Sequence, residues 1–149
     1  MAESGRARIE AIWLKSAKLG PMRPVSEATL VAGQGLEGNA NRGGYRQVTL
    51  LDANAWETAT GEIGVDVSPE ARRANLLLRG VDLADTAGRV LRVAGCRIKI
   101  RGETLPCERM EEAAPGLQAA LGPDWRGGAY GLVLDGGPLA LGDAVAWES

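Results

Sequence analysis

The residues best able to do chemistry lie in the stretch Thr104-Leu105-Pro106-Cys107-Glu108-Arg109-Met110. Cys107 carries a soft, ionisable sulfur directly after a proline, where a predicted β-hairpin gives way to a helix-forming segment. A thiol reacts or binds a metal as its thiolate, which helix N-termini and neighbouring cations favour. Because Pro106 suits the first turn of a helix, the pattern places Cys107 near the positive end of a helix over 108–113.

A second interpretation of the cysteines comes from the same residues. Three glutamates between positions 108 and 112 oppose a further negative charge near Cys107, and a free cysteine is commonly a small buried hydrophobic residue. The local pattern therefore leaves a reactive or ligating Cys107 and a merely structural one both open. Cys96 shares a predicted strand face with two isoleucines, so we expect it in the core. A Cys96–Cys107 disulfide is not expected in a reducing compartment.

The chain contains no histidine. Histidine is the usual general base, the commonest metal ligand and the side chain that titrates near neutral pH. Its absence excludes zinc chemistry of the ordinary His-rich kind. A catalytic triad would have to use Lys, Asp or Glu in its place.

A glycine-rich loop and a pair of arginines could bind an anion. Five glycines occur between residues 33 and 44, and such a loop allows close backbone approach and exposed N–H groups. Its spacing matches neither the dinucleotide fingerprint nor the P-loop, so a turn-rich surface loop is equally compatible. Arg72 and Arg73 form the densest cationic pair, for which a solvated helix face is the alternative.

The elements that must position these residues are short. Alternation and turn residues predict strands over 6–14, 25–31, 46–51, 89–94, 96–100, 129–134 and 144–147. Short helices are expected after Asp52, after Ser68, over 108–113 and over 116–121, with the boundary near Asn75 left open between helix and strand. Residues 15–23 are predicted to be a loop, and Gly136-Gly137-Pro138 a turn.

This pattern predicts a mainly β fold. Many short strands joined by glycine turns favour a compact β-barrel with short peripheral helices, or a sandwich with helical insertions. A doubly wound α/β fold is less compatible, because long crossover helices are not evident. A chain of 149 residues suits one domain over 1–149, with roughly 68–70% of its unfolded surface buried. Since the chain has no Phe, that core must be mostly aliphatic.

Charge and hydropathy limit the partners. A net charge of -2, from 17 basic and 19 acidic residues, argues against a nucleic-acid partner. The opening residues are polar and charged, and no apolar run approaches the length of about 20 residues that spans a bilayer. Two cysteines do not make a disulfide framework. We therefore expect no signal peptide, no membrane association and a cytoplasmic setting.

The order and spacing of several segments together resemble the MOSC domains, a family named for the C-terminal domain of molybdenum cofactor sulfurase. The similarity covers nearly the whole chain and implies a single domain over 1–149, a compact β-barrel that holds the pterin-based molybdenum cofactor. The segments that carry it are Gly35-Leu36-Glu37-Gly38, Arg46-Gln47-Val48-Thr49-Leu50, Arg73-Ala74-Asn75-Leu76, Gly80-Val81-Asp82-Leu83, Gly95-Cys96-Arg97-Ile98, Thr104-Leu105-Pro106-Cys107, Arg126-Gly127-Gly128, Gly136-Gly137 and Gly142-Asp143-Ala144-Val145.

The resemblance also implies roles for individual residues. Cys107 takes the position of the cysteine that ligates molybdenum in relatives, and a soft thiolate suits a transition metal that in turn stabilises its deprotonated form. The cofactor carries a phosphate, so cations and loop N–H groups become plausible partners. The expected cofactor-binding set is Lys18, Arg23, Gly35, Gly38, Asn39, Arg46, Arg73, Asn75 and Arg126.

One departure from the family pattern affects the expected activity. Many relatives continue the Gly-Leu-Glu-Gly motif with an aspartate and, two residues later, a histidine, where this chain has Asn39 and Asn41. Amides form hydrogen bonds but do not shuttle protons near neutral pH. Cofactor binding survives this change more easily than turnover. The chain also lacks the aminotransferase-like domain of the full-length sulfurases, so we expect no pyridoxal phosphate.

Three functions follow from these expectations. The first is a small molybdoenzyme that uses Cys107 as metal ligand, receives electrons from a donor protein and reduces N-hydroxylated or similar N–O substrates. The second is a non-catalytic carrier of the cofactor, or of sulfur as a Cys107 persulfide supplied by a sulfur-donor protein. The third is a degenerate interaction module whose site has decayed.

Overall fold

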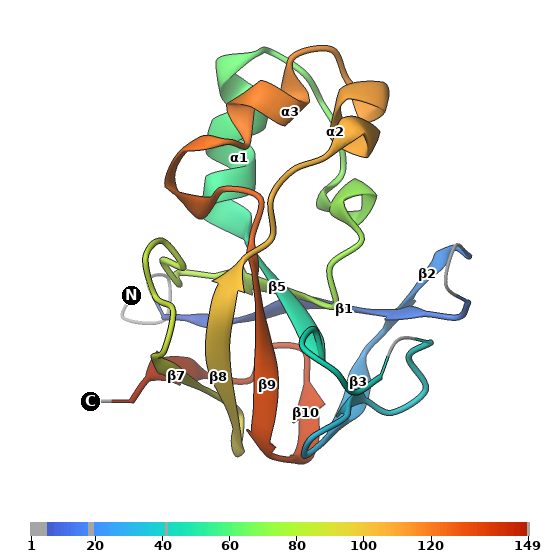
Figure 1. Ribbon diagram of the computed structural model, residues 1–149, viewed down its shortest axis with the longest axis vertical. Coiled ribbons are helices and arrows are strands. Elements are labelled where there is room, and N and C mark those ends of the chain that lie inside the picture. The colour runs from blue at the N-terminus through green and yellow to red at the C-terminus, as the bar shows by residue number, and fades with distance from the viewer. Residues whose placement is uncertain (1–5, 18–19, 41, 149) are drawn as a thin grey trace.

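The computed structural model describes residues 6–17, 20–40 and 42–148, which form a mainly β protein with short helices (Figure 1). The strands of the larger sheet are β1 (Arg8–Lys15), β2 (Met22–Val25), β5 (Val48–Asp52), β6 (Leu76–Arg79), β7 (Val90–Val93), β8 (Cys96–Glu103), β9 (Ala129–Asp135) and β11 (Val145–Trp147). A three-stranded sheet contains β3 (Glu27–Val31), β4 (Gly35–Leu36) and β10 (Gly137–Ala140).

The eight strands of the larger sheet follow the order β11-β7-β8-β9-β5-β6-β1-β2. Its pairs are antiparallel except for β5 and β6, whose parallel pairing needs a crossover that α1 and a 3₁₀ turn supply. The sheet is not closed into a barrel, although an isolated bridge joins Arg8 of β1 to Ala144, just before β11. The predicted mainly β class with short peripheral helices is confirmed.

Three helices gather at one end of the sheet: α1 (Ala53–Glu62), α2 (Glu108–Ala113) and α3 (Leu117–Ala120) (Figure 1). Two 3₁₀ turns, Pro69–Arg72 and Pro123–Trp125, lie in the connections. Asp52 caps α1 as expected, because its carboxylate accepts the N–H of Asn54 at 2.9 Å.

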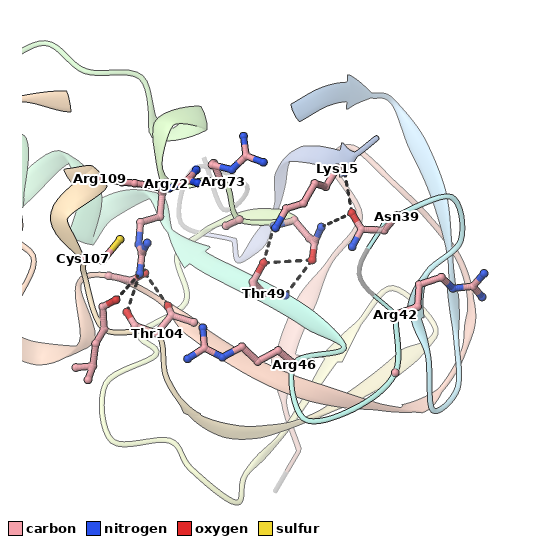
Figure 2. Close-up of a pocket in the computed structure, with 15 residues that line it drawn as sticks. Lys15, Asn39, Arg42, Arg46, Thr49, Arg72, Arg73, Thr104, Cys107 and Arg109 are labelled. Carbon is pink, nitrogen blue, oxygen red and sulfur yellow. Dashed lines mark hydrogen bonds between the residues drawn. The ribbon is translucent and has the colours of Figure 1, made fainter. Parts of the chain in front are cut away.

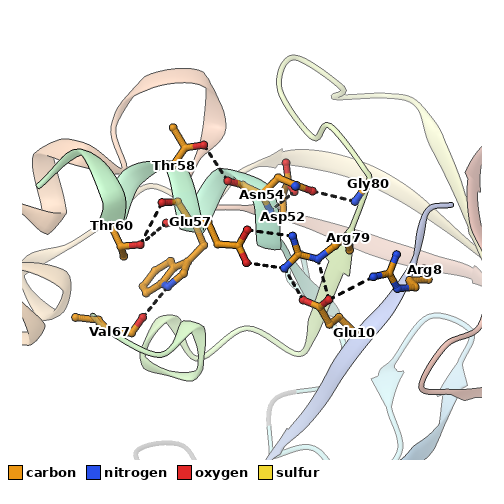
Figure 3. Close-up of polar contacts among 11 residues, drawn as sticks. Arg8, Glu10, Asp52, Asn54, Glu57, Thr58, Thr60, Val67, Arg79 and Gly80 are labelled. Carbon is orange, nitrogen blue, oxygen red and sulfur yellow. Dashed lines mark hydrogen bonds and ion pairs between the residues drawn. The ribbon is translucent and has the colours of Figure 1, made fainter. Parts of the chain in front are cut away.

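Polar contacts hold α1 against the sheet (Figure 3). The guanidinium of Arg79, at the end of β6, donates to Glu10 of β1 at 2.8 Å and to Glu57 of α1 at 2.6 Å. The indole of Trp56 donates to the carbonyl of Val67 at 2.9 Å. These contacts hold α1 in place, and α1 in turn packs against α3, which contacts α2, the helix directly after Cys107.

The apolar side chains form two clusters, one within the curved sheet and one between the sheet and the helices. The first contains Cys96, which is fully buried, so its predicted role in the core is confirmed. The second contains Met110 of α2 and Leu117 of α3. Burial of Met110 anchors α2 and, with it, Cys107, the residue directly before the helix.

Two predictions of local structure are wrong. The proposed turn at Gly136-Gly137-Pro138 opens strand β10, which pairs with β3. Gly136 permits this approach, because a side chain there would collide with the carbonyl of Leu30. The end of the predicted 15–23 loop belongs to strand β2, whose buried Met22 packs in the second cluster and pairs with Lys15 of β1. Here the apolar side chain outweighs the neighbouring proline and glycine.

Candidate functional site

A cavity of about 700 Å³ opens between the end of β1, the loop before β5 and the segment after β8. Six cationic side chains line it, and no carboxylate of the described residues does, although the whole chain carries a net charge of -2. The side chain of Cys107 also lines the cavity (Figure 2). The cationic lining residues are Lys15, Arg42, Arg46, Arg72, Arg73 and Arg109. Such a lining attracts anions, because nothing of opposite charge within it neutralises the cations.

Cys107 is exposed and is the residue directly before α2, which begins at Glu108. The predicted placement of Cys107 at the start of a helix is thus confirmed, although the helix has only six residues and carries Glu108 and Glu111 in its first turn. Both cysteines are free, in agreement with the expectation that they form no disulfide. An exposed thiol is available to a ligand, whereas Cys96 is not.

Arg72 fixes the segment that leads to Cys107. Its Nε donates to the carbonyl of Gly127 at 2.8 Å, and its Nη2 donates to the carbonyls of Thr104 and Leu105 at 2.9 and 3.1 Å (Figure 2). Gly127 must be glycine, since a Cβ there would lie 2.6 Å from the oxygen of Thr104. Burial lowers the pKa of Arg72, while negative charge on nearby Cys107 acts in the opposite direction.

An amide network forms the opposite wall (Figure 2). The buried Asn75 accepts hydrogen bonds from the backbone N–H and the hydroxyl of Thr49 at 3.1 and 3.2 Å. Its Nδ2 donates to the carbonyl of Trp13 at 3.2 Å and to Oδ1 of Asn39 at 3.3 Å. The same oxygen of Asn39 accepts the backbone N–H of Lys15 at 2.7 Å. Asn39 and Asn75 therefore shape the wall of the cavity and join β1, β5 and β6.

Lys15 is the lysine among the described residues that line the cavity. Burial lowers the pKa of Lys15, and the positive charges of Arg73 and Arg109 lower it further. No ion pair of its ammonium is present among the described residues. The cation is thus held where an added anion would relieve its electrostatic cost.

Arg46 and Arg73, which the sequence predicted as cofactor-binding cations, both line this cavity and are held there by different contacts. The guanidinium of Arg46 lies 4.8 Å from the centre of the Tyr130 ring, a cation–π distance that supports its position. Arg73 has a left-handed backbone, with φ of 63°, and its Nη2 donates to the carbonyl of Gly20 at 2.7 Å. Together with Asn39, Asn75 and Cys107, these two arginines are the sequence-predicted residues that the cavity brings together.

The other predicted residues lie elsewhere. Arg23 and Gly38 line a separate depression next to β3 and β10. Gly35 packs against the backbone of Gln47, and a side chain there would collide with the Gln47 carbonyl. Arg126 forms an ion pair with Glu62 at 2.9 Å and is held away from the cavity. Lys18 lies outside the described residues.

The glycine-rich loop contributes side chains rather than a row of free N–H donors. Six of its amides, at residues 33, 34, 37, 39, 40 and 43, donate to main-chain carbonyls. The loop instead places Asn39, Arg42 and Gly43 on the cavity wall. A backbone anion cradle made of these six amides is therefore not available.

The expected cofactor-binding set omitted four of the six cations, namely Lys15, Arg42, Arg72 and Arg109. Arg72 was visible as a neighbour of Arg73, and Arg109 as a neighbour of Cys107. Lys15 was predicted to begin the 15–23 loop, where its charge had no partner in the local sequence. Arg42 lies in the glycine-rich loop, and nothing in the spacing indicates which way that loop turns.

A family model for the MOSC domain matches residues 37–146. The chain belongs to the MOSC domain family, which is associated with binding of the molybdenum cofactor. The match includes the loop before β5, the Arg72–Asn75 segment and the Cys107 segment, and thus most of the cavity wall. A comparison with curated protein sequences found no match.

Solved structures share the fold. YuaD from Bacillus subtilis superimposes with a TM-score of 0.77 at 20% identity, covering 93% of each chain. YiiM from Geobacillus stearothermophilus gives a TM-score of 0.74 at 16% identity, covering 96% of this chain and 75% of that one. YiiM from Escherichia coli gives 0.70 at 17% identity, covering 95% and 70%. These likenesses extend over almost the whole chain.

Among the described residues, no group of three or more His, Cys, Asp or Glu side chains is placed to hold a metal ion. In the same part of the chain, no helix is long and apolar enough to cross a membrane.

Proposed function

We propose that the cationic cavity binds the pterin-based molybdenum cofactor and that Cys107 is the protein ligand to its metal. The observation that carries the proposal is the exposed thiol of Cys107 on the wall of a cavity with six cations and no carboxylate among its described residues. A thiolate suits this metal, and the cofactor's phosphate suits the cations. Family membership adds to this argument, because the family is associated with that cofactor.

The residues of the cavity fit the cofactor in two respects. A cofactor that carries its own sulfur ligands needs only one ligand from the protein, which agrees with the lack of a multi-residue metal cluster in the described chain. A phosphate needs several donors, and Lys15, Arg46 and Arg73 offer them from three different segments. Asn75 does not compete for this role, since both ends of its amide already have partners.

The bound cofactor would supply two-electron redox chemistry. We propose that the loaded protein uses it to reduce N-hydroxylated or similar N–O compounds, as the family resemblance implies. The N–O bond breaks, two electrons arrive from a donor protein, two protons are taken up, and an amine-type product and water leave. Within the chain, Cys107 would hold the metal and the cations of the cavity would hold the phosphate.

The test is metal and pterin analysis of protein made in a host that synthesises the cofactor. We expect about one molybdenum per chain in the wild type, none in Cys107→Ser, and unchanged content in Cys96→Ala, the matched control at the other cysteine. Metal retained by Cys107→Ser would overturn the ligation, and a wild type free of both metal and pterin would overturn the binding.

The same preparation separates an enzyme from a carrier. Loaded protein is mixed with a chemical reductant and a small N-hydroxylated amidine, and the reduced product is quantified. Multiple turnovers that disappear in Cys107→Ser support the reductase. Full molybdenum content without product would leave the carrier role, with cofactor or sulfane sulfur on Cys107, as the function.

A further inference from the structure

Arg72 is a half-buried cation of the cavity whose guanidinium is held by main-chain carbonyls rather than by an acidic partner. No Asp or Glu of the described chain forms an ion pair with it. Buried cations usually have a counter-charge. Here three main-chain carbonyls satisfy part of the guanidinium, at 2.8 to 3.1 Å.

Those three carbonyls belong to the two segments that meet beside Cys107. Thr104 and Leu105 precede it by three and two residues, and Gly127 belongs to the loop that enters β9. Thr104 strengthens the same junction, because its hydroxyl donates to Gly127 at 2.8 Å and its N–H to Gly128 at 2.9 Å. One guanidinium therefore fixes the approach of the chain to Cys107.

The charge of Arg72 is also directed toward the thiol. Its Nη1 donates to no described acceptor, while the residue lines the cavity next to Cys107 (Figure 2). Arg109 lies on the same wall but is exposed, so solvent weakens its field. Glu108 and Glu111, in the first turn of α2, act in the opposite direction. Arg72 is thus the fixed and shielded cation at this end of the cavity.

We infer that Arg72 is a positioning residue for Cys107: it clamps the segment that carries the thiol and supplies a fixed positive potential that draws anionic groups to the sulfur. The inference deepens the proposed function, because it assigns the residue that prepares the ligating thiol in a chain without histidine. Its test uses protein without metal, so the outcome does not depend on whether the cofactor binds.

The test compares two alkylating reagents at Cys107 at neutral pH. In both reactions the sulfur attacks carbon, an S–C bond forms and iodide leaves, so the ratio of the iodoacetate rate to the iodoacetamide rate cancels the reactivity of the thiol itself. The ratio reports the potential that the anionic reagent meets. Mass spectrometry of the peptide containing Cys107 gives each rate, and hydrogen exchange of the Thr104 N–H, which donates to the carbonyl of Gly128, reports the clamp.

Three variants separate the clamp from the charge. Arg72→Met is expected to lower the ratio at least about threefold, because a unit charge within a few ångströms of an anion is worth more than thermal energy even in water, and to speed exchange of the segment. Arg72→Lys should keep most of the ratio yet speed exchange, since an ammonium cannot reproduce the guanidinium fork. Arg109→Met, the exposed control, should change the ratio less and leave exchange unaltered.

The inference is overturned if Arg72→Met keeps the wild-type ratio and exchange, or if Arg109→Met lowers the ratio as much as Arg72→Met does. A role in folding alone would speed exchange throughout the protein without changing the ratio, which also refutes the assignment. Should Arg72→Met fail to fold, Arg72→Gln replaces it in the charge comparison, and Arg72→Lys still decides the clamp.

Discussion

Replacing Asn75 with alanine should destabilise the protein strongly, because its buried amide joins three strands. The substitution removes two accepted hydrogen bonds from Thr49, at 3.1 and 3.2 Å, and two donated ones, to Trp13 at 3.2 Å and Asn39 at 3.3 Å. Two main-chain groups, the N–H of Thr49 and the carbonyl of Trp13, would each lose their hydrogen bond to the Asn75 side chain.

The expected magnitude follows from those two groups. A buried polar group left without a partner costs about 1–3 kcal/mol, so the loss in the free energy of unfolding should be about 2–6 kcal/mol. Domains of this kind are stable by only about 5–15 kcal/mol. A change of this size would remove a large part of the stability of the chain.

Urea unfolding followed by tryptophan fluorescence measures the effect on Asn75→Ala. The matched control is Thr58→Ala, an exposed side chain whose hydroxyl donates within α1 to Asn54 at 3.0 Å, for which we expect about 0.5 kcal/mol or less. A loss below about 1 kcal/mol in Asn75→Ala, with an unchanged dependence on urea, would refute the reasoning, since the network would then contribute no more than a surface contact.

Three further predictions concern the charge of the cavity. Because the pKa of Lys15 is lowered, phosphate affinity measured by calorimetry should weaken as pH rises through that lowered pKa. The phosphate affinity of Lys15→Arg should not weaken over the same pH range. Between the lowered pKa of Lys15 and its ordinary value of 10.5, the unfolded chain binds a proton that the folded chain has lost. The free energy of unfolding of the unliganded protein should therefore rise with pH over this range, and a fall would contradict the prediction. Asn39→Asp keeps the acceptor for Lys15 and Asn75 but adds a negative charge, so phosphate affinity should drop severalfold and the pKa of Lys15 should rise, as NMR titration would show. Equal phosphate affinity in the wild type and in Asn39→Asp would show that charge at position 39 does not influence anion binding.

Much of the fold was accessible from the sequence, because hydrophobic alternation marks strands independently of their partners. The exceptions were segments whose local residues favour turns while their distant partners favour strands. Gly137 and Pro138 begin β10 because β3 offers a free edge and Gly136 lets the backbones approach. Such pairing depends on a segment more than a hundred residues away along the chain.

The candidate site was predictable in its centre and less so in its lining. Cys107, Arg73 and Asn39 stand out by residue type or by family pattern, and the cavity does bring them together. Arg126 was predicted from the same family pattern, but its guanidinium donates to Glu62, 64 positions away, and does not line the cavity. Lys15 shows the reverse case: it reaches the cavity only because β1 ends there. Direction and partner choice of long charged side chains are set by tertiary contacts, which one sequence does not display.

The guanidinium of Arg72 spans contacts to residues 32, 33 and 55 positions away, and this has a consequence for the order of folding. Long loops must close before such contacts form, and their closure entropy is paid before any interaction repays it. The segment bearing Cys107 should therefore acquire its native surroundings after β5 and β6 have paired, because their partners Leu50 and Leu76 are closer together along the chain. In a nascent or partly unfolded chain the exposed thiol would lack the nearby charge of Arg72, so its preference for iodoacetate over iodoacetamide should appear only in molecules that have finished folding.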